Sequence, residues 1–274
     1  MGPSQQLLDR IWQVPAYLPY LQPSLTKQVV SDAESRLGIK LPDAYLALLE
    51  RQNGGYIRYE IEELPHTVIA GIGPHYPTIT EANLEEADEY VSFELRGLVP
   101  FDGDGHWHLC LDYRGTSQNA PSVSYIDIEC DDQRKIAGSF EGYLAQLVPS
   151  IPESGVWFTP PSNTEEFIKK LAKQTGSKVY DVDTFAHGYP VHRLGRDKAW
   201  AWLSPNDVAR GFVREEHIRF DELRDRLPGT ARRYPELPDN AWIATSTDTL
   251  TRSLRDALAS LGCKPGSLVT AIQE

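Results

Sequence analysis

The sequence predicts an α+β protein with two domains, and three observations support this expectation. Segments with helical spacing of apolar residues and segments with strand-like alternation follow one another without a regular βαβ order. Proline, serine and glycine gather at residues 149–155, which is typical of a linker. The charge changes at the same place, because residues 1–150 carry 10 Lys and Arg against 22 Asp and Glu, whereas residues 151–274 carry 17 of each. We therefore expect domains at residues 1–150 and 151–274.

An aromatic, proline-broken arm of about 23 residues opens the first domain, and two helices are expected after it. The first helix spans residues 24–37, or begins at Ser31, which has capping-box spacing to Glu34. The second helix is expected within LPDAYLALLERQNGG (residues 41–55), with Pro42 in its first turn and with Tyr and Leu recurring at helical spacing. Gly54 and Gly55 are expected to end this helix in a left-handed turn, and not to hold a phosphate, because they follow the helix instead of preceding it.

Strands dominate the remainder of the first domain. YIRYEIEEL (56–64) predicts a strand, TITEANLEEADEYV (78–91) a loop and a short acidic helix, and RGLVPFDGDGHWHLCLDYR (96–114) two strands around an Asp-Gly turn. In the strand SVSYIDIEC (122–130), Val123 and Tyr125 point to one face while Ser124, Ile126 and Ile128 point to the other. SFEGYLAQLV (139–148) predicts the helix that closes this domain.

The second domain is expected to be a smaller α+β unit. Its predicted strands are GVWFTP (155–160), KVYDVDTF (178–185), YPVHRLG (189–195) and KAWAWLS (198–204). Its predicted helices are NTEEFIKKLAKQTG (163–176), FDELRDRL (220–227) and DTLTRSLRDALASLG (248–262). Asn163 and Gly176 are suitable caps for the first of these helices.

The sequence contains no motif that specifies catalysis or a cofactor. G-x-x-x-x-G-K-[ST], G-x-S-x-G and H-E-x-x-H are all missing, and the three cysteines form no C-x-x-C pair. We therefore expect a protein that is not an enzyme and needs no cofactor. Cysteine usage and the start of the chain favour a reducing cytoplasm, and no apolar run suits a membrane span.

Two groups of residues resemble metal or ligand sites without meeting the usual requirements. Asp102, Asp104, His106 and His108 would share one face of a strand, yet Asp-Gly-Asp-Gly is itself a turn sequence, so no metal is expected. In the second domain, His187 and His192 lie near Asp181 and Asp183, and we interpret these as solvated strand residues. The tryptophans of that domain are expected in its core or, alternatively, along a ligand groove; they are Trp157, Trp200, Trp202 and Trp242.

Three segments in the right order resemble the SUKH superfamily of Smi/Knr-type domains. They are DAESRLGIKLPDAYLALLERQNGG, then GLVPFDGDGHWHLCLDY, then SVSYIDIECDDQRKIAGSFEGYLAQLV, and the resemblance covers about residues 24–148. It implies an antiparallel or mixed sheet flanked by helices, without catalytic residues. Many bacterial members are immunity proteins that bind and block a cognate polymorphic toxin domain in the cytoplasm. Fungal relatives regulate cell-wall synthesis and signalling.

The resemblance and the charge together predict a non-catalytic immunity protein whose partner is a toxin domain, with no nucleic-acid or membrane partner. An acidic surface repels phosphate backbones and attracts basic proteins such as nucleases. We expect the contacts to be made by exposed acids of the first domain: Glu60, Glu62, Glu63, Glu85, Glu86, Asp88, Glu89, Glu94, Asp131 and Asp132. The alternatives are a scaffold or regulator that binds endogenous proteins, and a small-molecule-binding or enzymatic second domain.

Overall fold

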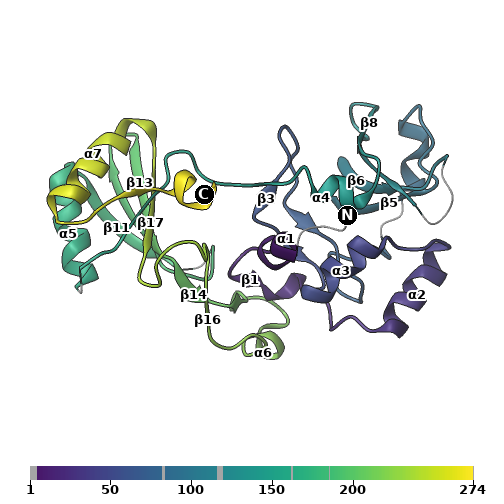
Figure 1. Cartoon of the computed structure of the whole chain (residues 1–274), viewed down its shortest axis with the longest axis horizontal. Coiled ribbons are helices and arrows are strands. Elements are labelled where there is room, and N and C mark those ends of the chain that lie inside the picture. The colour runs from purple at the N-terminus through teal and green to yellow at the C-terminus, as the bar shows by residue number, and fades with distance from the viewer. Residues whose placement is uncertain (1–4, 82–83, 116–119, 162, 185, 274) are drawn as a thin grey trace. The chain divides into compact units, whose positions relative to one another are not determined.

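The protein is represented by a computed structural model, in which two compact units follow each other along the chain (Figure 1). The structure describes all residues except 1–4, 82–83, 116–119, 162, 185 and 274. The first unit comprises Met1–Pro149 and the second Ser150–Glu274. Both units combine helices with antiparallel sheets, as the α+β expectation requires.

The first unit is built from one longer sheet and many short elements. Its helices are α1 (Gln5–Arg10), η1 (Leu18–Tyr20), α2 (Lys27–Leu37), α3 (Asp43–Arg51), η2 (Glu85–Tyr90) and α4 (Phe140–Leu144), of which η1 and η2 are 3₁₀ helices. Its strands are β1 (Ala16–Tyr17), β2 (Gly55–Tyr56), β3 (Tyr59–Glu60), β4 (Val68–Ile69), β5 (Leu98–Gly103), β6 (Trp107–Asp112), β7 (Ser122–Asp127), β8 (Asp132–Ala137) and β9 (Val148–Pro149).

Strands β5, β6, β7 and β8 form an antiparallel meander in that order. The two strands expected around the Asp-Gly turn are confirmed as β5 and β6. Their pairing shifts between Pro100 and Asp102. Proline has no amide hydrogen for the ladder, and an irregularity of this kind re-aims the side chain beside it. Phe101 is the residue that the shifted pairing skips, and beyond it the carboxylate of Asp102 lies 2.6 Å from His66 Nδ1.

The expected strand at residues 56–64 is wrong in its length. The chain instead forms two separate two-residue strands: β2 pairs with β4, and β3 pairs with β9. Ile57, between them, forms an isolated bridge with Trp12 of the N-terminal arm. The segment therefore changes its partner every few residues, which the alternation of its side chains does not reveal.

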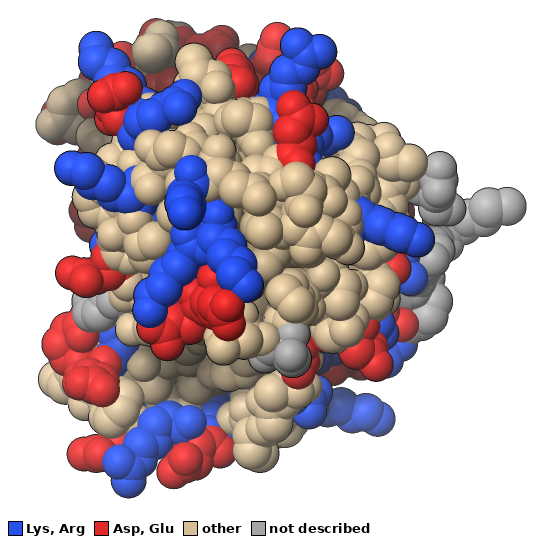
Figure 2. Space-filling view, turned by 90° about the vertical axis from the view of Figure 1, so that its left-hand side faces the viewer, with Lys and Arg blue, Asp and Glu red and all other residues tan. Residues whose placement is uncertain are grey.

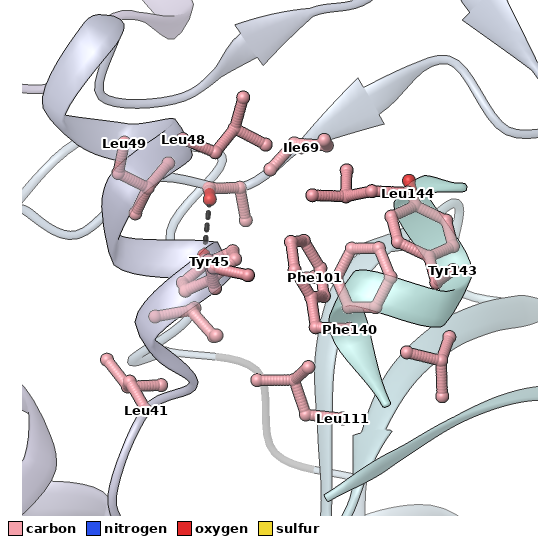
Figure 3. Packing of buried hydrophobic residues seen from close by; sticks show 14 of the residues in the cluster. Leu41, Tyr45, Leu48, Leu49, Ile69, Phe101, Leu111, Phe140, Tyr143 and Leu144 are labelled. Carbon is pink, nitrogen blue, oxygen red and sulfur yellow. Dashed lines mark hydrogen bonds between the residues drawn. The ribbon is translucent and has the colours of Figure 1, made fainter. Parts of the chain in front are cut away.

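The sheet of the first unit packs on both faces, as Figure 3 shows for the helix side. There Tyr45 of α3 contacts Phe140 of α4 edge to face at 5.2 Å, and Phe140 contacts Phe101 of β5 at 5.6 Å. Val123 and Tyr125 of β7 belong to this cluster, whereas Ile126 and Ile128 pack on the opposite face. The predicted facing of this strand is confirmed.

The opposite face of the sheet is covered by the segment that contains η2. Leu84 and Leu95 lie against Leu98, Cys110 and Ile126, and all five are buried. The acidic residues of η2 therefore belong to a segment whose apolar side chains pack against the sheet.

The capping residues explain where the two long helices of the first unit begin and end. The Thr26 side chain accepts a hydrogen bond from the Val29 amide, so α2 begins at Lys27, between the two starts that the sequence allowed. Gly38 ends it in the left-handed conformation, as expected. For α3 the expected glycine cap is wrong, because Gln52 caps the helix in an extended conformation and Gly54 and Gly55 lie beyond it.

The second unit is built around a six-stranded antiparallel sheet in the order β11-β12-β13-β17-β10-β18. Its strands are β10 (Val156–Phe158), β11 (Lys178–Asp183), β12 (Val191–Arg196), β13 (Ala199–Pro205), β14 (Asp207–Ala209), β15 (Gly211–Phe212), β16 (Thr230–Arg232), β17 (Trp242–Ser246) and β18 (Gly266–Ser267). Its helices are α5 (Thr164–Thr175), α6 (Phe220–Leu223), α7 (Asp248–Ser260) and α8 (Leu268–Gln273).

Helices α5 and α7 cover one face of this sheet and supply its largest core. Phe167 and Leu171 of α5 and Leu254 of α7 pack against Leu194 and Leu203 of the sheet. The predicted caps of α5 are confirmed, since Asn163 accepts from the Glu166 amide and Gly176 is left-handed. The outer surface of this unit mixes both signs of charge around a broad uncharged area, on the side that carries α5 and α7 (Figure 2).

Candidate partner-binding surface

The Asn53-Gly54-Gly55 segment is a structural joint of the first unit. The Asn53 side chain accepts from the Ile72 amide at 2.8 Å and donates to the carbonyl oxygens of Ile72 and Pro23 at 2.9 and 2.7 Å. Gly54 has φ of +87°, and a Cβ there would lie 2.7 Å from the Gly71 nitrogen. The segment therefore clamps the arm and the loop at residues 71–73 together, and only glycine permits the close approach.

A buried polar chain joins the loop before β4 to β5 and α4. His66 Nδ1 lies 2.6 Å from Asp102 Oδ2, and His66 Nε2 meets the Tyr143 hydroxyl. Burial raises the pKa of Tyr143 well above its usual value, so its hydroxyl stays protonated. Asp102 Oδ2 also accepts from the amides of Thr67 and Val68.

The hydrogen-bonded set of His66, Asp102 and Tyr143 has the residue types of a catalytic relay. Its geometry, however, suits a structural role. Tyr143 is completely buried, and the His66 side chain is likewise without exposed surface. A catalytic group must reach substrate, and neither the ring nor the phenol does so. The hydrogen bonds of this set instead link the loop before β4 to β5 and α4.

The side chains of three of the four residues that suggested a metal have other partners. Asp102 bonds His66, Asp104 accepts from the amides of His106 and Trp107, and His106 pairs with Glu129 at 2.7 Å. Burial lowers the pKa of His108, which is thus neutral near pH 7. Across the described ranges of the chain, no three His, Cys, Asp or Glu side chains gather as a metal site would require.

Three of the acids expected to contact a partner lie at or beside the β7–β8 hairpin. Asp131 and Asp132 lie at its turn, and Asp131 accepts from the Ser92 amide at 2.6 Å, which joins the turn to the chain that follows η2. On the other side, Arg134 of β8 donates to the Glu63 carbonyl oxygen at 3.4 Å. Nine of the ten acids are exposed, and the side chain of Glu85 lies outside the described part of the chain; the nine are Glu60, Glu62, Glu63, Glu86, Asp88, Glu89, Glu94, Asp131 and Asp132.

Two of these acids also have a conformational role. Glu63 and Asp131 have φ of 64° and 49°, in the left-handed region that side chains other than Gly, Asn and Asp seldom adopt. Replacing Asp131 would add backbone strain to the change of charge, because Asp tolerates this region better than most side chains. Glu62, Asp88 and Asp132 have no such role, so they are the better positions for testing charge alone.

A pocket that the sequence did not predict opens beside the β5–β6 turn. Its volume is about 490 Å³, and its walls include Tyr20, Tyr56, Tyr76, Asp104 and Trp107. These residues are far apart in the sequence, and the only indication was the aromatic composition of the N-terminal arm. The arm packs on the unit, as expected, and Trp12 belongs to its main core.

The tryptophans and histidines of the second unit do not converge on one site. His187 and Trp202 line a pocket of about 290 Å³ that also includes Arg233, whose guanidinium lies 4.3 Å from the centre of the Tyr189 ring. His192 packs on Trp242 instead, at 5.3 Å. Of the other tryptophans, Trp157 packs against the core formed by Leu237, Ala241, Ile243 and Leu268, and Trp200 contacts Tyr180.

All three thiols are poor nucleophiles, because only the thiolate attacks and each pKa is raised. Burial raises the pKa of Cys110 and Cys263, and the charge of Asp127 raises that of Cys130. None of them is placed to act as an activated cysteine.

The first unit is thus an α+β domain in which buried polar groups hold the scaffold, and nine of the acids expected to contact a partner are exposed. Residues 24–146 match the sequence model of the SMI1 / KNR4 family (SUKH-1), so the first unit contains a SUKH-type domain, and the resemblance stated for residues 24–148 is confirmed. No curated protein matches the chain. No helix in the described ranges has the length and apolar character needed to cross a membrane.

Proposed function

We propose that this protein is a non-catalytic immunity protein that binds and neutralises a cognate bacterial polymorphic toxin domain in the cytoplasm. The observation that carries the proposal is the SUKH-1 match of residues 24–146, a family to which many such immunity proteins belong. The partner is a protein, and the contact is made by the first unit.

The charge of the first unit supports a basic partner. All of the net charge of −12 arises in residues 1–150, and nine of the proposed contact acids are exposed. Complementary charge speeds the encounter of two proteins and suppresses wrong partners. A nuclease fits this surface, because its substrate demands Lys and Arg at the phosphate-binding site.

The surroundings of a buried histidine and of two thiols in the first unit are compatible with neutralisation by binding. Its buried histidine has no access to substrate, and its two thiols, Cys110 and Cys130, have raised pKa values. An inhibitor of this kind acts by occupying a surface of the toxin, so one molecule blocks one toxin domain.

A survival test examines the proposal directly. The C-terminal domain encoded by the open reading frame just upstream is expressed in a sensitive host, with and without this protein. We expect death in its absence and growth in its presence. Toxicity without rescue, or no toxicity, would contradict the proposal and favour a regulator that binds endogenous proteins, the function of other SUKH relatives.

A further inference from the structure

The pocket beside the β5–β6 turn has walls of aromatic rings. Tyr20 stacks on Tyr56 at 4.9 Å and contacts Tyr76 edge to face at 5.5 Å. Tyr76 is 67% exposed, which is unusual for so large an apolar ring. Trp107 completes the lining on the side of the sheet. The space that these rings line has a volume of about 490 Å³.

The lining of the same pocket also includes acidic residues. Asp102 and Asp104 both line it, and no lysine or arginine is found among its described lining residues. The amides of His106 and Trp107 bond Asp104 Oδ1, and the bond from His106 is the main reason that the pKa of Asp104 is low. The carboxylate is thus charged at neutral pH. His108, also in the lining, has a pKa lowered by burial and adds no positive charge there.

We propose that this pocket binds an arginine side chain of the protein partner. Aromatic faces attract cations through their quadrupoles, and carboxylates pair with them. Among protein cations, guanidinium is the better match, because it is flat, weakly hydrated and able to stack on a ring while its edge donates to a carboxylate. That the arginine comes from a protein partner rests on the proposed function. The match between the pocket and a guanidinium group does not depend on it.

The test uses the full chain and N-acetyl-arginine amide, followed by NMR of the tyrosine and tryptophan rings. N-acetyl-citrulline amide is the matched probe, since it has almost the same shape and no charge. We expect the arginine probe to shift the ring signals of Tyr76 and Trp107 and the citrulline probe to have little effect. Equal shifts with both probes, or shifts elsewhere only, would overturn the proposal.

Two variants with matched controls locate the binding. Tyr76→Ala removes a ring, and Asp104→Asn removes the charge while keeping an oxygen for the two amides. Each is expected to weaken binding about 3- to 30-fold, the range that cation–π and ion-pair losses give. Tyr90→Ala, at a ring of 66% exposure, and Asp88→Asn should leave it unchanged. Unchanged binding in both pocket variants would overturn the proposal.

Two further outcomes separate this proposal from the proposed function. Free arginine that bound far more tightly than the blocked probe would indicate a small-molecule site and overturn the assignment to a protein partner. Survival of the toxin-expressing host without any probe binding would refute the pocket alone. Probe binding without rescue would leave the guanidinium site in place and refute the toxin as its source.

Discussion

Asn53 and Gly54 illustrate how single residues hold the first unit. Asn53 satisfies three backbone groups of two other segments, and Gly54 lets the chain pass close to Gly71. No sequence motif predicts either role, although asparagine and glycine are residue types that suit such roles. Asparagine offers a donor and an acceptor on one short side chain, and glycine combines positive φ with the absence of Cβ.

The substitution Gly54→Ala should destabilise the protein more than Gly38→Ala. Both glycines have positive φ, so both alanines introduce strain of ~1–2 kcal/mol. At Gly38 a Cβ meets nothing within 4 Å, whereas at Gly54 it meets the Gly71 backbone at 2.7 Å. Overpacking adds ~1–3 kcal/mol at Gly54. Urea unfolding measures both, and equal losses would refute the close-approach explanation.

The variant Tyr143→Phe should lower the free energy of unfolding by ~1–3 kcal/mol, because it leaves buried His66 Nε2 without its hydrogen-bond partner. Tyr125→Phe is the control, since its hydroxyl makes only a 3.5 Å bond to Asp127, and its cost should stay within ~0.5 kcal/mol. Urea denaturation compares the two. An equal, small effect would show that the His66 chain contributes nothing to stability.

At the scale of elements, Asp112 joins β6 to β7 and to the turn after β6. Its carboxylate accepts from Ser124 at 2.7 Å and from the Arg114 guanidinium at 3.0 and 2.8 Å. Burial alone would raise the pKa of Asp112, but the bonds from Arg114 and Ser124 outweigh it and hold the pKa below its usual value. Charged-group bonds of this kind stabilise the sheet only while the carboxylate is ionised.

The contribution of Asp112 to stability should depend on pH. Because its folded pKa lies below the unfolded value of ~3.9, the contribution is fully present above that value and is lost as pH falls through the folded pKa. Asp112→Asn should therefore cost ~1–3 kcal/mol at pH 7. The difference from the unmodified chain should shrink below about pH 4. Unfolding curves between pH 7 and pH 3 measure this, and a pH-independent difference would contradict it.

Elements whose ends are determined by neighbouring residues could be predicted from the sequence. Elements whose length depends on pairing with distant segments could not. Helix α5 lies where Asn163 and Gly176 place it, because caps act within one turn. The length of the strand at 56–64 was wrong because its pairing depends on β4, β9 and Trp12. The aromatic pocket was missed for the same reason, since its rings come from four separate segments.

At the scale of the whole molecule, the two units differ in charge and in what they expose. The first carries the full negative charge, and the second is neutral, with ion pairs such as Lys169–Glu165 at 2.6 Å along α5. The core cluster that contains Tyr45 and Phe101 belongs to the first unit, and the clusters that contain Phe158 and Leu237 belong to the second. The proposal therefore predicts that electrostatic attraction of a basic partner acts through the first unit.

Charge reversal should separate the two units in their effect on association. The triple variant Glu62→Lys, Asp88→Lys and Asp132→Lys should slow association with a basic toxin domain by about 10-fold or more at low salt and flatten its salt dependence. The control reverses three exposed acids of the second unit, Glu153, Asp207 and Asp256, with the same change in net charge. Stopped-flow mixing measures both rates. Equal slowing would show that only total charge matters.

The most direct measurement is a titration of the toxin domain's activity with the purified full-length protein. Binding without catalysis predicts that activity falls linearly and reaches zero at one molecule per toxin domain, with the mass of the toxin unchanged. Loss of activity at far lower ratios and growing with time would show turnover and contradict the central claim. So would full activity at a several-fold excess of the protein.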